Sequence, residues 1–424
     1  MKFRFTSHLP LWLFVILSFL TLPLSVTAQR AKRRAAAQKK DSSAVVHFSA
    51  GQSALNVPFD LAGNLIFVQG RLNNSAPLWF IFDTGASSSV VDVKLAKTLG
   101  LKTRGHILGT GSAGTTMASR VRNVSVALPG VEVSGLTVYT LPVDFLSAPL
   151  GRRIGGVIGN DLIGACVVEI DYANKVINFY DRQGYHYNGT GEVIPFTVEG
   201  DGNIYGRAKV EIEGGAPLEG KFEIDTGSTG ALELNTPFVK KHRLLSLVKR
   251  SKRVNVGGVG GTAGAVTTRA RTVKLGKFAL ENVIVRLSQA TKGDFASAQH
   301  DGTLGGAIFR RFKFTIDIQG RRLILEPNAQ LAAPFEDDMS GIELVGDGPD
   351  FSTYLIDEVQ ENSPAAEAGV QGGDVLTAID GRPASALTLE EVHQMFMQDG
   401  REYLLTLKRG DKTVQARIKL RRLI

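Results

Sequence analysis

The chain has 424 residues, 43% hydrophobic and 21% charged, a composition typical of a globular protein with two or three domains rather than of a disordered one. Its formal charge of +8 comes from eight Lys and Arg residues within residues 1–40, which contain no acid; residues 41–424 hold 41 basic and 41 acidic residues. This neutral body argues against a surface that binds nucleic acid.

The N-terminus has the pattern of an export signal. A basic start precedes an apolar run at residues 11–24, and small residues follow up to Ala28. We therefore predict a signal peptide at residues 1–28 and a protein exported from a bacterial cell, to the periplasm or the exterior. The alternative of an uncleaved anchor stays open, although the run is short for a bilayer. After cleavage we expect no transmembrane span, and residues 29–45 form a basic linker.

The middle of the chain contains an internal duplication. Residues 80–87 align with residues 222–229 at an offset of 142, and both carry Asp-Thr-Gly after an apolar strand. Later in each half, an apolar segment ends at Gly159 and at Gly305, an offset of 146. Short β-branched and aromatic runs alternate with Gly and Asn turns throughout, which predicts strands. We predict two similar β lobes, at residues 46–182 and 190–327, with short helices at residues 92–99 and 237–245.

Each half supplies one Asp-Thr-Gly motif. Two copies in matching contexts are stronger evidence for a catalytic role than a single copy. A single copy is weak because it also occurs as an ordinary turn after a strand. In both copies the Gly permits a sharp turn and lets backbone amides approach the carboxylate. Two such loops meeting across a pseudo-two-fold axis would place two carboxylates side by side, one protonated while the other is ionised. The candidate site residues are Asp83 and Asp225 as the catalytic pair and Thr84, Gly85, Thr226, Gly227 and Ser228 as loop support.

These motifs resemble those of the pepsin and retropepsin class of aspartic peptidases. Asp83-Thr84-Gly85 is followed by Val157-Ile158-Gly159, and Asp225-Thr226-Gly227 by Thr303-Leu304-Gly305. The resemblance implies a mainly β, bilobal fold of two duplicated β-barrel lobes, in which the two Thr hydroxyls bond across the interface. It further implies an endopeptidase that activates water with its Asp pair and needs no metal, cofactor or covalent intermediate.

The two motifs differ at the residue after the Gly, which is Ala86 in the first lobe and Ser228 in the second. A hydroxyl that donates a hydrogen bond to a carboxylate favours its ionised form. We therefore predict a bond from Ser228 to Asp225, with Asp225 carrying the charge more often than Asp83.

A glycine-rich segment in each half predicts a hairpin over the cleft. Residues 109–114 match the Gly-x-Gly-x-x-Gly dinucleotide pattern, but that pattern requires a following helix and residues 115–126 read as a strand. We predict a mobile flap here and a counterpart at residues 257–264; neither contains the Tyr usual in pepsin-type flaps, which favours the retropepsin side of the class. A glycine-rich hairpin with no substrate role remains the alternative. The candidate flap residues are Gly109, Gly111, Ser112, Gly114, Gly258 and Gly261.

The last segment, residues 340–424, changes character. A Ser-Pro-Ala-x-x-Ala-Gly segment at residues 363–369, a Gly-Asp pair and a capping box at Thr388 resemble the PDZ domain of bacterial exported proteases. The resemblance implies an α+β domain that binds a peptide as an added strand beside residues 354–359. A packing or spacer role is the alternative. The candidate peptide-binding residues are Phe351, Tyr354, Leu355, Ile356 and Val392.

Three functions follow from this sequence, and the third is a processing or sensing protease with one physiological target, which the sequence does not separate from the first. The first is an exported aspartic endopeptidase acting on proteins or peptides, with the C-terminal domain recruiting substrate or gating the cleft. The second is a catalytically silent scaffold that binds peptides, although a scaffold has no need of two carboxylates that meet. Cys166, the single cysteine, lies in an apolar run and is predicted to be a core residue.

Overall fold

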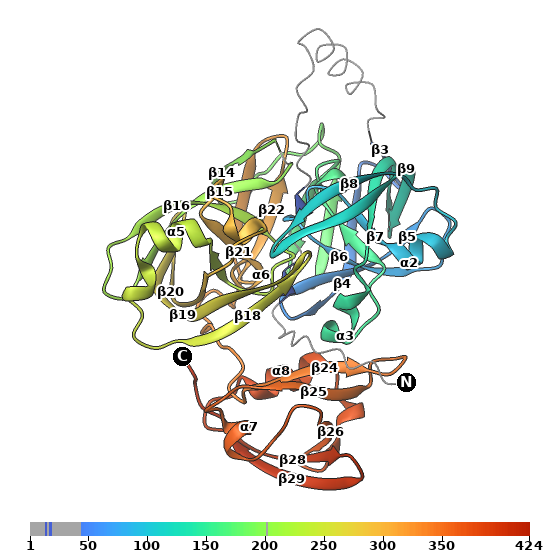
Figure 1. Cartoon of the computed structure of the whole chain (residues 1–424). Helices are drawn as coiled ribbons and strands as arrows, with labels where there is room; N and C mark the ends of the chain where they lie inside the picture. The colour runs from blue at the N-terminus through green and yellow to red at the C-terminus, as the bar shows by residue number, and fades with distance from the viewer. Residues whose placement is uncertain (1–12, 15–16, 19–43, 201) are drawn as a thin grey trace.

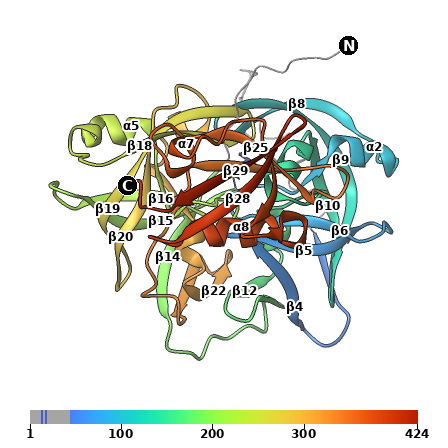
Figure 2. The ribbon, with the colours of Figure 1, turned by 90° about the horizontal axis from the view of Figure 1, so that it is seen from below.

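The computed structural model describes residues 13–14, 17–18, 44–200 and 202–424. Two β lobes lie side by side, and the C-terminal domain packs below both of them (Figure 1). Seen from below, its strands and helix α8 lie across the boundary between the lobes (Figure 2). The predicted signal peptide and basic linker lie almost entirely outside the described residues. Within the described part of the chain, no helix has the length and apolar character needed to cross a bilayer.

The first lobe is built from strands with short helices at their ends. Helix α2 begins after Asp92, whose carboxylate accepts hydrogen bonds from the backbone N–H groups of Lys94 and Leu95, so the helix predicted here is confirmed. The elements are β3 Val45–Phe48, β4 Ser53–Ala62, β5 Leu65–Leu72, β6 Leu78–Phe82, β7 Val90–Asp92, α2 Val93–Thr98, β8 Arg104–Gly111, β9 Gly114–Leu128, β10 Val131–Leu141, the 3₁₀ turn η1 Asp144–Leu146, α3 Ser147–Leu150, β11 Gly156–Ile158, α4 Asn160–Ile163, β12 Val167–Asp171 and β13 Val176–Tyr180.

The second lobe repeats this order. The helix predicted at residues 237–245 is divided into α5, with Pro237 in its first turn, and a 3₁₀ turn, because Arg243 between them has a left-handed backbone. The elements are β14 Glu192–Val198, β15 Ile204–Ile212, β16 Leu218–Asp225, β17 Leu232–Leu234, α5 Thr236–Lys241, η2 Leu244–Ser246, β18 Lys252–Gly258, β19 Gly261–Leu275, β20 Phe278–Ser288, η3 Asp294–Ala296, β21 Gly302–Gly305, α6 Gly306–Phe309, β22 Phe312–Asp317 and β23 Arg322–Pro327.

The strand pairing shows the duplication directly. In the first lobe β6, which leads to Asp83, pairs in parallel with β11. In the second lobe β16, which ends at Asp225, pairs in parallel with β21. The strands β7 and β17 likewise pair in parallel with β10 and β20. Each acid is therefore delivered by the same local arrangement, and the apolar segments ending at Gly159 and Gly305 are the neighbours of the two acid-bearing strands.

A shared sheet joins the lobes. Its order is β4-β13-β12-β22-β23-β14, with the lobes meeting where Val168 of β12 pairs with Ile316 of β22. The largest buried hydrophobic cluster runs through both lobes, whereas the C-terminal domain has a cluster of its own. Cys166 belongs to the first of these, as predicted, and burial raises the pKa of its thiol to about 12. The two lobes therefore behave as one body, to which a separately packed domain is attached.

The C-terminal domain is a small sheet with a capped helix. Thr388 accepts a hydrogen bond from the N–H of Glu391, whose carboxylate accepts one from the N–H of Thr388, so the predicted capping box is present. The elements are β24 Ile342–Asp347, β25 Thr353–Val359, α7 Pro364–Glu367, β26 Val375–Ile379, β27 Arg382–Pro383, η4 Ala384–Ala386, α8 Leu389–Phe396, β28 Glu402–Arg409 and β29 Lys412–Lys419.

Candidate active site

The two Asp-Thr-Gly loops are joined by reciprocal hydrogen bonds. Thr84 Oγ1 donates to the carbonyl of Ile224 (2.6 Å) and accepts from the N–H of Thr226 (3.0 Å). Thr226 Oγ1 donates to the carbonyl of Phe82 (2.7 Å) and accepts from the N–H of Thr84 (3.1 Å). Both threonines are fully buried. The bonds implied by the resemblance are therefore present, and they fix the two loops relative to each other.

This lock leads to a prediction about stability. Replacing Thr226 by Val should lower the free energy of unfolding by about 2–4 kcal/mol, because a buried carbonyl and a buried N–H lose their partners. The matched control is Thr226→Ser, which keeps the hydroxyl and should recover most of the loss. Calorimetric melting of the full-length variants is the measurement, and equal melting temperatures for the Val and Ser variants would contradict the lock.

The two carboxyl groups are buried against each other's loops. Asp83 Oδ1 accepts hydrogen bonds from the N–H groups of Gly85 (2.8 Å) and Ala86 (3.1 Å), and Asp225 Oδ1 accepts one from Gly227 (2.6 Å). A Cβ on Gly85 would lie 2.6 Å from Cγ of Asp225, and a Cβ on Gly227 would lie 2.2 Å from Cγ of Asp83. The two glycines are therefore required by the close approach of the opposite carboxyl group.

Burial makes it unfavourable to ionise both groups. It is the main cause that raises the pKa of Asp83 well above its ordinary value, and the neighbouring Asp225 raises it further. Burial also raises the pKa of Asp225, but the hydrogen bond donated by Asp83 opposes that rise. The favoured arrangement therefore has one proton for the two carboxyl groups, which belongs to the pair rather than to either acid.

The predicted contribution of Ser228 is wrong. Its side chain is buried, but its Oγ has no hydrogen-bond partner among the described residues, so it does not donate to Asp225. The close packing of Ser228 against Gly305 explains its position. The difference between Ala86 and Ser228 therefore gives the two acids no difference in side-chain hydrogen bonding.

The predicted flaps form hairpins whose tips meet. Gly111 pairs with Gly114 at the tip of the β8–β9 hairpin, which excludes the dinucleotide-binding helix. Gly258 pairs with Gly261 at the tip of the β18–β19 hairpin. A Cβ on Gly111 would lie 2.2 Å from the carbonyl oxygen of Val259, so the tips touch backbone to backbone. Glycine at this position permits the contact.

The other flap positions hold the first tip in place. Ser112 is buried, and its carbonyl accepts a hydrogen bond from the N–H of Phe295 in the second lobe (3.0 Å). Gly114 lies against Gly260 of the opposite tip, and Gly109 pairs with Thr116 within its own hairpin. The structure therefore describes flaps that are closed onto each other.

Each flap also accepts an added strand. The short strand β1, Leu13–Phe14, pairs in parallel with Gly257 and Gly258 of β18. The short strand β2, Leu17–Ser18, pairs antiparallel with Gly111 and Thr110 of β8. The outer edges of both flap strands can therefore bind an extended backbone by main-chain hydrogen bonds.

A group of buried polar residues near the pair was not predicted from the sequence. Asn203 Nδ2 donates to the carbonyl of Gly85 (3.1 Å) and to Glu223 Oε1 (2.5 Å), which links the first catalytic loop to strand β16. The signal was an acid two positions before Asp225, where the first lobe has Ile81. An acid inside an apolar strand should have predicted a buried polar contact.

Nearby, His300 Nε2 lies 2.9 Å from Asp294 Oδ2 and its Nδ1 lies 2.9 Å from the carbonyl oxygen of Gly302. Burial lowers the pKa of His300, but Asp294 and these hydrogen bonds outweigh that effect and raise it. Glu223, Asp294 and His300 place ligand atoms within 4.8 Å of one another. An imidazolium that donates from both nitrogens offers no lone pair to a metal, so we assign this group a structural role.

The predicted peptide groove of the C-terminal domain needs correction. Strand β25 lies inside the sheet, because Tyr354 and Leu355 pair with β24 on one side and β26 on the other. Tyr354, Ile356 and Val392 belong to the buried core of the domain. Phe351 lies in the turn before β25 with a left-handed backbone. The edge strands of this sheet are β24 and β29, so an added peptide would pair with one of these and not beside residues 354–359.

Comparison with known proteins supports both parts of this description. A family model described as aspartyl protease matches residues 68–162 and 208–308, which include Asp83 and Asp225. A PDZ domain model matches residues 355–409.

Two proteins share shorter similarity with the chain. A probable CtpA-like serine protease from Staphylococcus haemolyticus is 32% identical over 90 residues, which are 20% of this chain and 18% of that protein. A solved photosystem II D1 C-terminal processing protease has 20% identity and a TM-score of 0.19, covering 20% of this chain and 23% of the other. The chain thus spans about a fifth of the length of these relatives. It contains two aspartyl protease segments, arranged as two mainly β lobes, followed by a C-terminal PDZ domain.

Proposed function

We propose that this protein is an exported aspartic endopeptidase in which Asp83 and Asp225 activate a water molecule. The observation that carries the proposal is the burial of two carboxyl groups together, each in an Asp-Thr-Gly loop and each held by backbone N–H groups. The serine protease named above shares only 90 residues with this chain. Its name therefore supports proteolysis but gives no reason to assign a serine nucleophile here.

The pair supports the following reaction. Ionised Asp225 takes a proton from water as the water oxygen attacks the scissile carbonyl carbon, while protonated Asp83 donates a hydrogen bond to the carbonyl oxygen. The tetrahedral intermediate then collapses as Asp225 gives the proton taken from water to the amide nitrogen and the C–N bond breaks, which releases an amine and a carboxylic acid. The closed flaps exclude bulk water, which strengthens these interactions. Opening of the tips must precede substrate entry.

The test is the pH dependence of peptide cleavage. Activity requires Asp225 ionised and Asp83 protonated, so it should fall below the first pKa of the pair and above the second. Because burial raises both pKa values, we expect the midpoint of the acidic limb to lie above the pKa of an exposed aspartate, which is about 4. The full-length protein is assayed with a peptide library between pH 3 and pH 9.

Two results would contradict the proposal. An acidic limb near pH 4 would show that the pair is exposed to solvent in the working enzyme. Peptide binding without cleavage at any pH would instead favour the scaffold function. Export is tested separately, by N-terminal sequencing of the protein recovered outside the cytoplasm, which should begin after Ala28.

A further inference from the structure

Two peptide groups of the first catalytic loop hold the carboxyl group of Asp83. The N–H of Gly85 lies 2.8 Å from Asp83 Oδ1, and the N–H of Ala86 lies 3.1 Å from the same oxygen. The carbonyls of these two peptide groups are those of Thr84 and Gly85. Because a peptide group is planar, a bond that fixes its carbonyl also fixes the direction of its N–H. The partners of these two carbonyls therefore orient the carboxyl group.

Both carbonyls accept a hydrogen bond from a buried asparagine. Asn160 Nδ2 donates to the carbonyl of Thr84 (2.8 Å), and Asn203 Nδ2 donates to that of Gly85 (3.1 Å). The two asparagines are 8% and 1% exposed. Asn160 begins α4 in the first lobe, whereas Asn203 lies in the turn before β15 of the second lobe. Each lobe thus supplies one amide to the loop that carries Asp83.

Each asparagine is fixed by a second partner. The N–H of Asn160 donates to the carbonyl of Ala86 (2.8 Å), and its Nδ2 also lies 3.2 Å from the carbonyl oxygen of Gly202. Asn203 Nδ2 also donates to Glu223 Oε1. A rotation of either side chain would break two hydrogen bonds in a buried place, which is costly. The two amides are therefore held in position behind the catalytic loop.

The duplication does not repeat the first of these amides. At the offset of 146, Asn160 corresponds to Gly306, whose N–H donates to the carbonyl of Ser228 (2.9 Å) as that of Asn160 does to Ala86. A Cβ on Gly306 would lie 2.4 Å from the carbonyl oxygen of Asn64. This position of the second lobe therefore has no room for a side chain.

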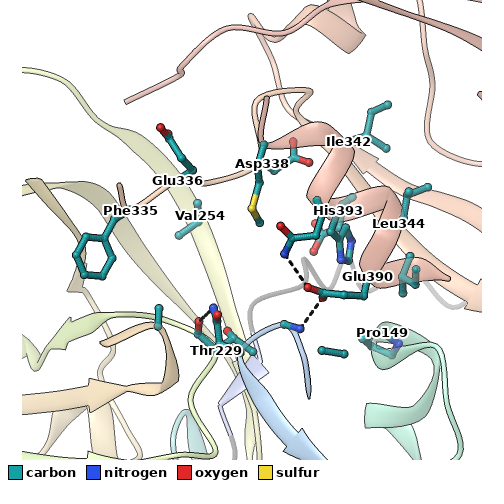
Figure 3. A pocket seen from close by; sticks show the side chains of 18 of the residues that line it. Pro149, Thr229, Val254, Phe335, Glu336, Asp338, Ile342, Leu344, Glu390 and His393 are labelled. Atoms are coloured by element: carbon teal, nitrogen blue, oxygen red, sulfur yellow. Dashed lines mark hydrogen bonds between the residues drawn. The ribbon is translucent and has the colours of Figure 1, made fainter. Parts of the chain in front are cut away.

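The second amide is repeated but has a different partner. The corresponding turn is Gly63–Asn64 before β5, and Asn64 Nδ2 donates to the carbonyl of Thr229 (2.8 Å), two residues beyond Gly227. Thr229 lines a cavity of about 760 Å³ between the lobes and the C-terminal domain, where Glu390 accepts a hydrogen bond from the N–H of Gly63 (2.7 Å) (Figure 3). This turn supports the second loop beyond the peptide group that bonds to its acid.

We propose that Asn160 and Asn203 are positioning residues of the acid pair, which hold the two peptide groups that fix Asp83. The inference rests on the proposed function, because it assumes that the pair cleaves a peptide bond. Each asparagine acts through a peptide group of the catalytic loop and not on the substrate itself. Both N–H bonds go to Oδ1, so the held carboxyl group keeps Oδ2 for the reaction. The amides also strengthen the two N–H donors, because hydrogen bonds in a chain polarise one another.

Loss of this support has a defined sign in the pH dependence. The N–H groups of Gly85 and Ala86 lower the pKa of Asp83, because they bond to its ionised form, so weaker bonds raise that pKa. In a coupled pair, a higher pKa of one acid moves at least one limb of the profile upward and neither limb downward.

Asn160→Ala isolates this effect from the other ionisable groups. Asn203→Ala removes a donor from Glu223, whereas Asn160 has no hydrogen bond to an acid among the described residues. The ionisable groups near the pair and the two asparagines are Asp225, Glu223, Asp294, His300, Asp161 and Tyr172.

The experiment compares the pH profiles of full-length wild type and Asn160→Ala between pH 3 and pH 9, with the library peptide that the wild type cleaves best. We expect kcat to fall by roughly tenfold and KM to change by less than about twofold, because a displaced catalytic group slows the reaction without removing substrate contacts. At least one limb of kcat/KM should move upward by roughly 0.5 pH units. Asn160→Gly copies the residue of the second lobe and should show the same shift, so it replaces the Ala variant if that variant does not fold.

Two further variants test the assignment. Asn203→Ala should lower kcat by roughly tenfold as well. The matched control is Asn64→Ala, which loses one amide-to-carbonyl bond at the corresponding turn. Its melting temperature should fall, because a buried hydrogen bond is lost, but both limbs of its pH profile should coincide with those of the wild type.

The possible failures are distinct. No cleavage by the wild type, or equal cleavage by Asp83→Asn, overturns the proposed function and this inference with it. If the pair is active, a profile of Asn160→Ala that coincides with the wild type or moves downward overturns this inference alone. An equal upward shift in Asn64→Ala also overturns it, because general loosening of the lobes would then explain the shift. An unchanged kcat in Asn203→Ala overturns the role of Asn203.

Discussion

Replacing either acid of the pair by Asn should reduce kcat/KM by on the order of 10⁴-fold, since an amide can neither take the proton of water nor share one proton with its neighbour. Both carboxyl groups are fully buried, so a carboxylate ion from solution cannot take the place of the one that is removed. Asp83→Asn and Asp225→Asn should lower kcat/KM to about the same extent, because the pair acts as a unit. The measurement is cleavage of the best library peptide at the pH optimum of the wild type.

The matched control is Asp161→Asn. Asp161 is a partly buried acid of the first lobe, and desolvation raises its pKa to about 6, but it accepts hydrogen bonds from Ser89 and lies outside the pair. We expect the Asp161 variant to lose less than about tenfold in kcat/KM. If Asp225→Asn cleaved as fast as this control, the assignment of the pair would be wrong.

Stability distinguishes a chemical loss from misfolding. The pKa of Asp83 is raised in the folded state, so the native protein binds its proton more tightly than the unfolded chain does. Stability from this group is therefore present at low pH and is lost as pH rises through the folded pKa. The Asn side chain carries no charge, so it lacks the cost of burying an ionised carboxylate at pH 7. The Asp83→Asn variant should therefore melt at the same temperature as the wild type at pH 7 or at a higher one.

The second large effect is expected for Gly227→Ala. The added Cβ would lie 2.2 Å from Cγ of Asp83 and 2.4 Å from both of its oxygens, and Cβ atoms are not tolerated at such distances. The loops must separate, which breaks the shared-proton geometry and strains the bonds between Thr84 and Thr226. We expect kcat/KM to fall by at least about 100-fold and the unfolding free energy to fall by about 1–3 kcal/mol or more.

Gly200→Ala provides the control for this change. Gly200 is exposed, and a Cβ there would have no neighbour within 4 Å. The activity and melting temperature of the Gly200→Ala variant should equal those of the wild type. A Gly227→Ala variant with wild-type kcat/KM would show that the two loops are not held as closely in solution as in the structure.

Short-range patterns predicted several elements for reasons that are local. Asp92 caps α2 and Thr388 caps α8 because a side-chain oxygen can reach the free N–H groups of its own first turn. The Gly111–Gly114 hairpin was predicted because the segment after it alternates as a strand. Such features need no knowledge of the distant chain.

Predictions that depended on distant partners were less successful. Ser228 was expected to donate to Asp225, but its direction is set by packing against Gly305, which is far along the chain. The resemblance placed the peptide groove beside residues 354–359, yet the sequence of a strand does not tell whether it is internal or at an edge. His300 and Asp294 carried no sequence signal, because only the fold brings them beside the pair.

The sequence by itself determined that two Asp-Thr-Gly loops lie at the ends of matching strands, because the duplication repeats the apolar strands, the glycines and the threonines in one order. The tertiary structure decided that the pKa values of both acids are raised, since this depends on their burial and on the proximity of the two carboxyl groups. It also decided that β24 and α8 face the lobes, because domain packing follows from complementary surfaces such as Gly63 with Glu390 and Lys252 with Asp337. Local patterns carry no record of such contacts, which are made by residues that the sequence keeps far apart.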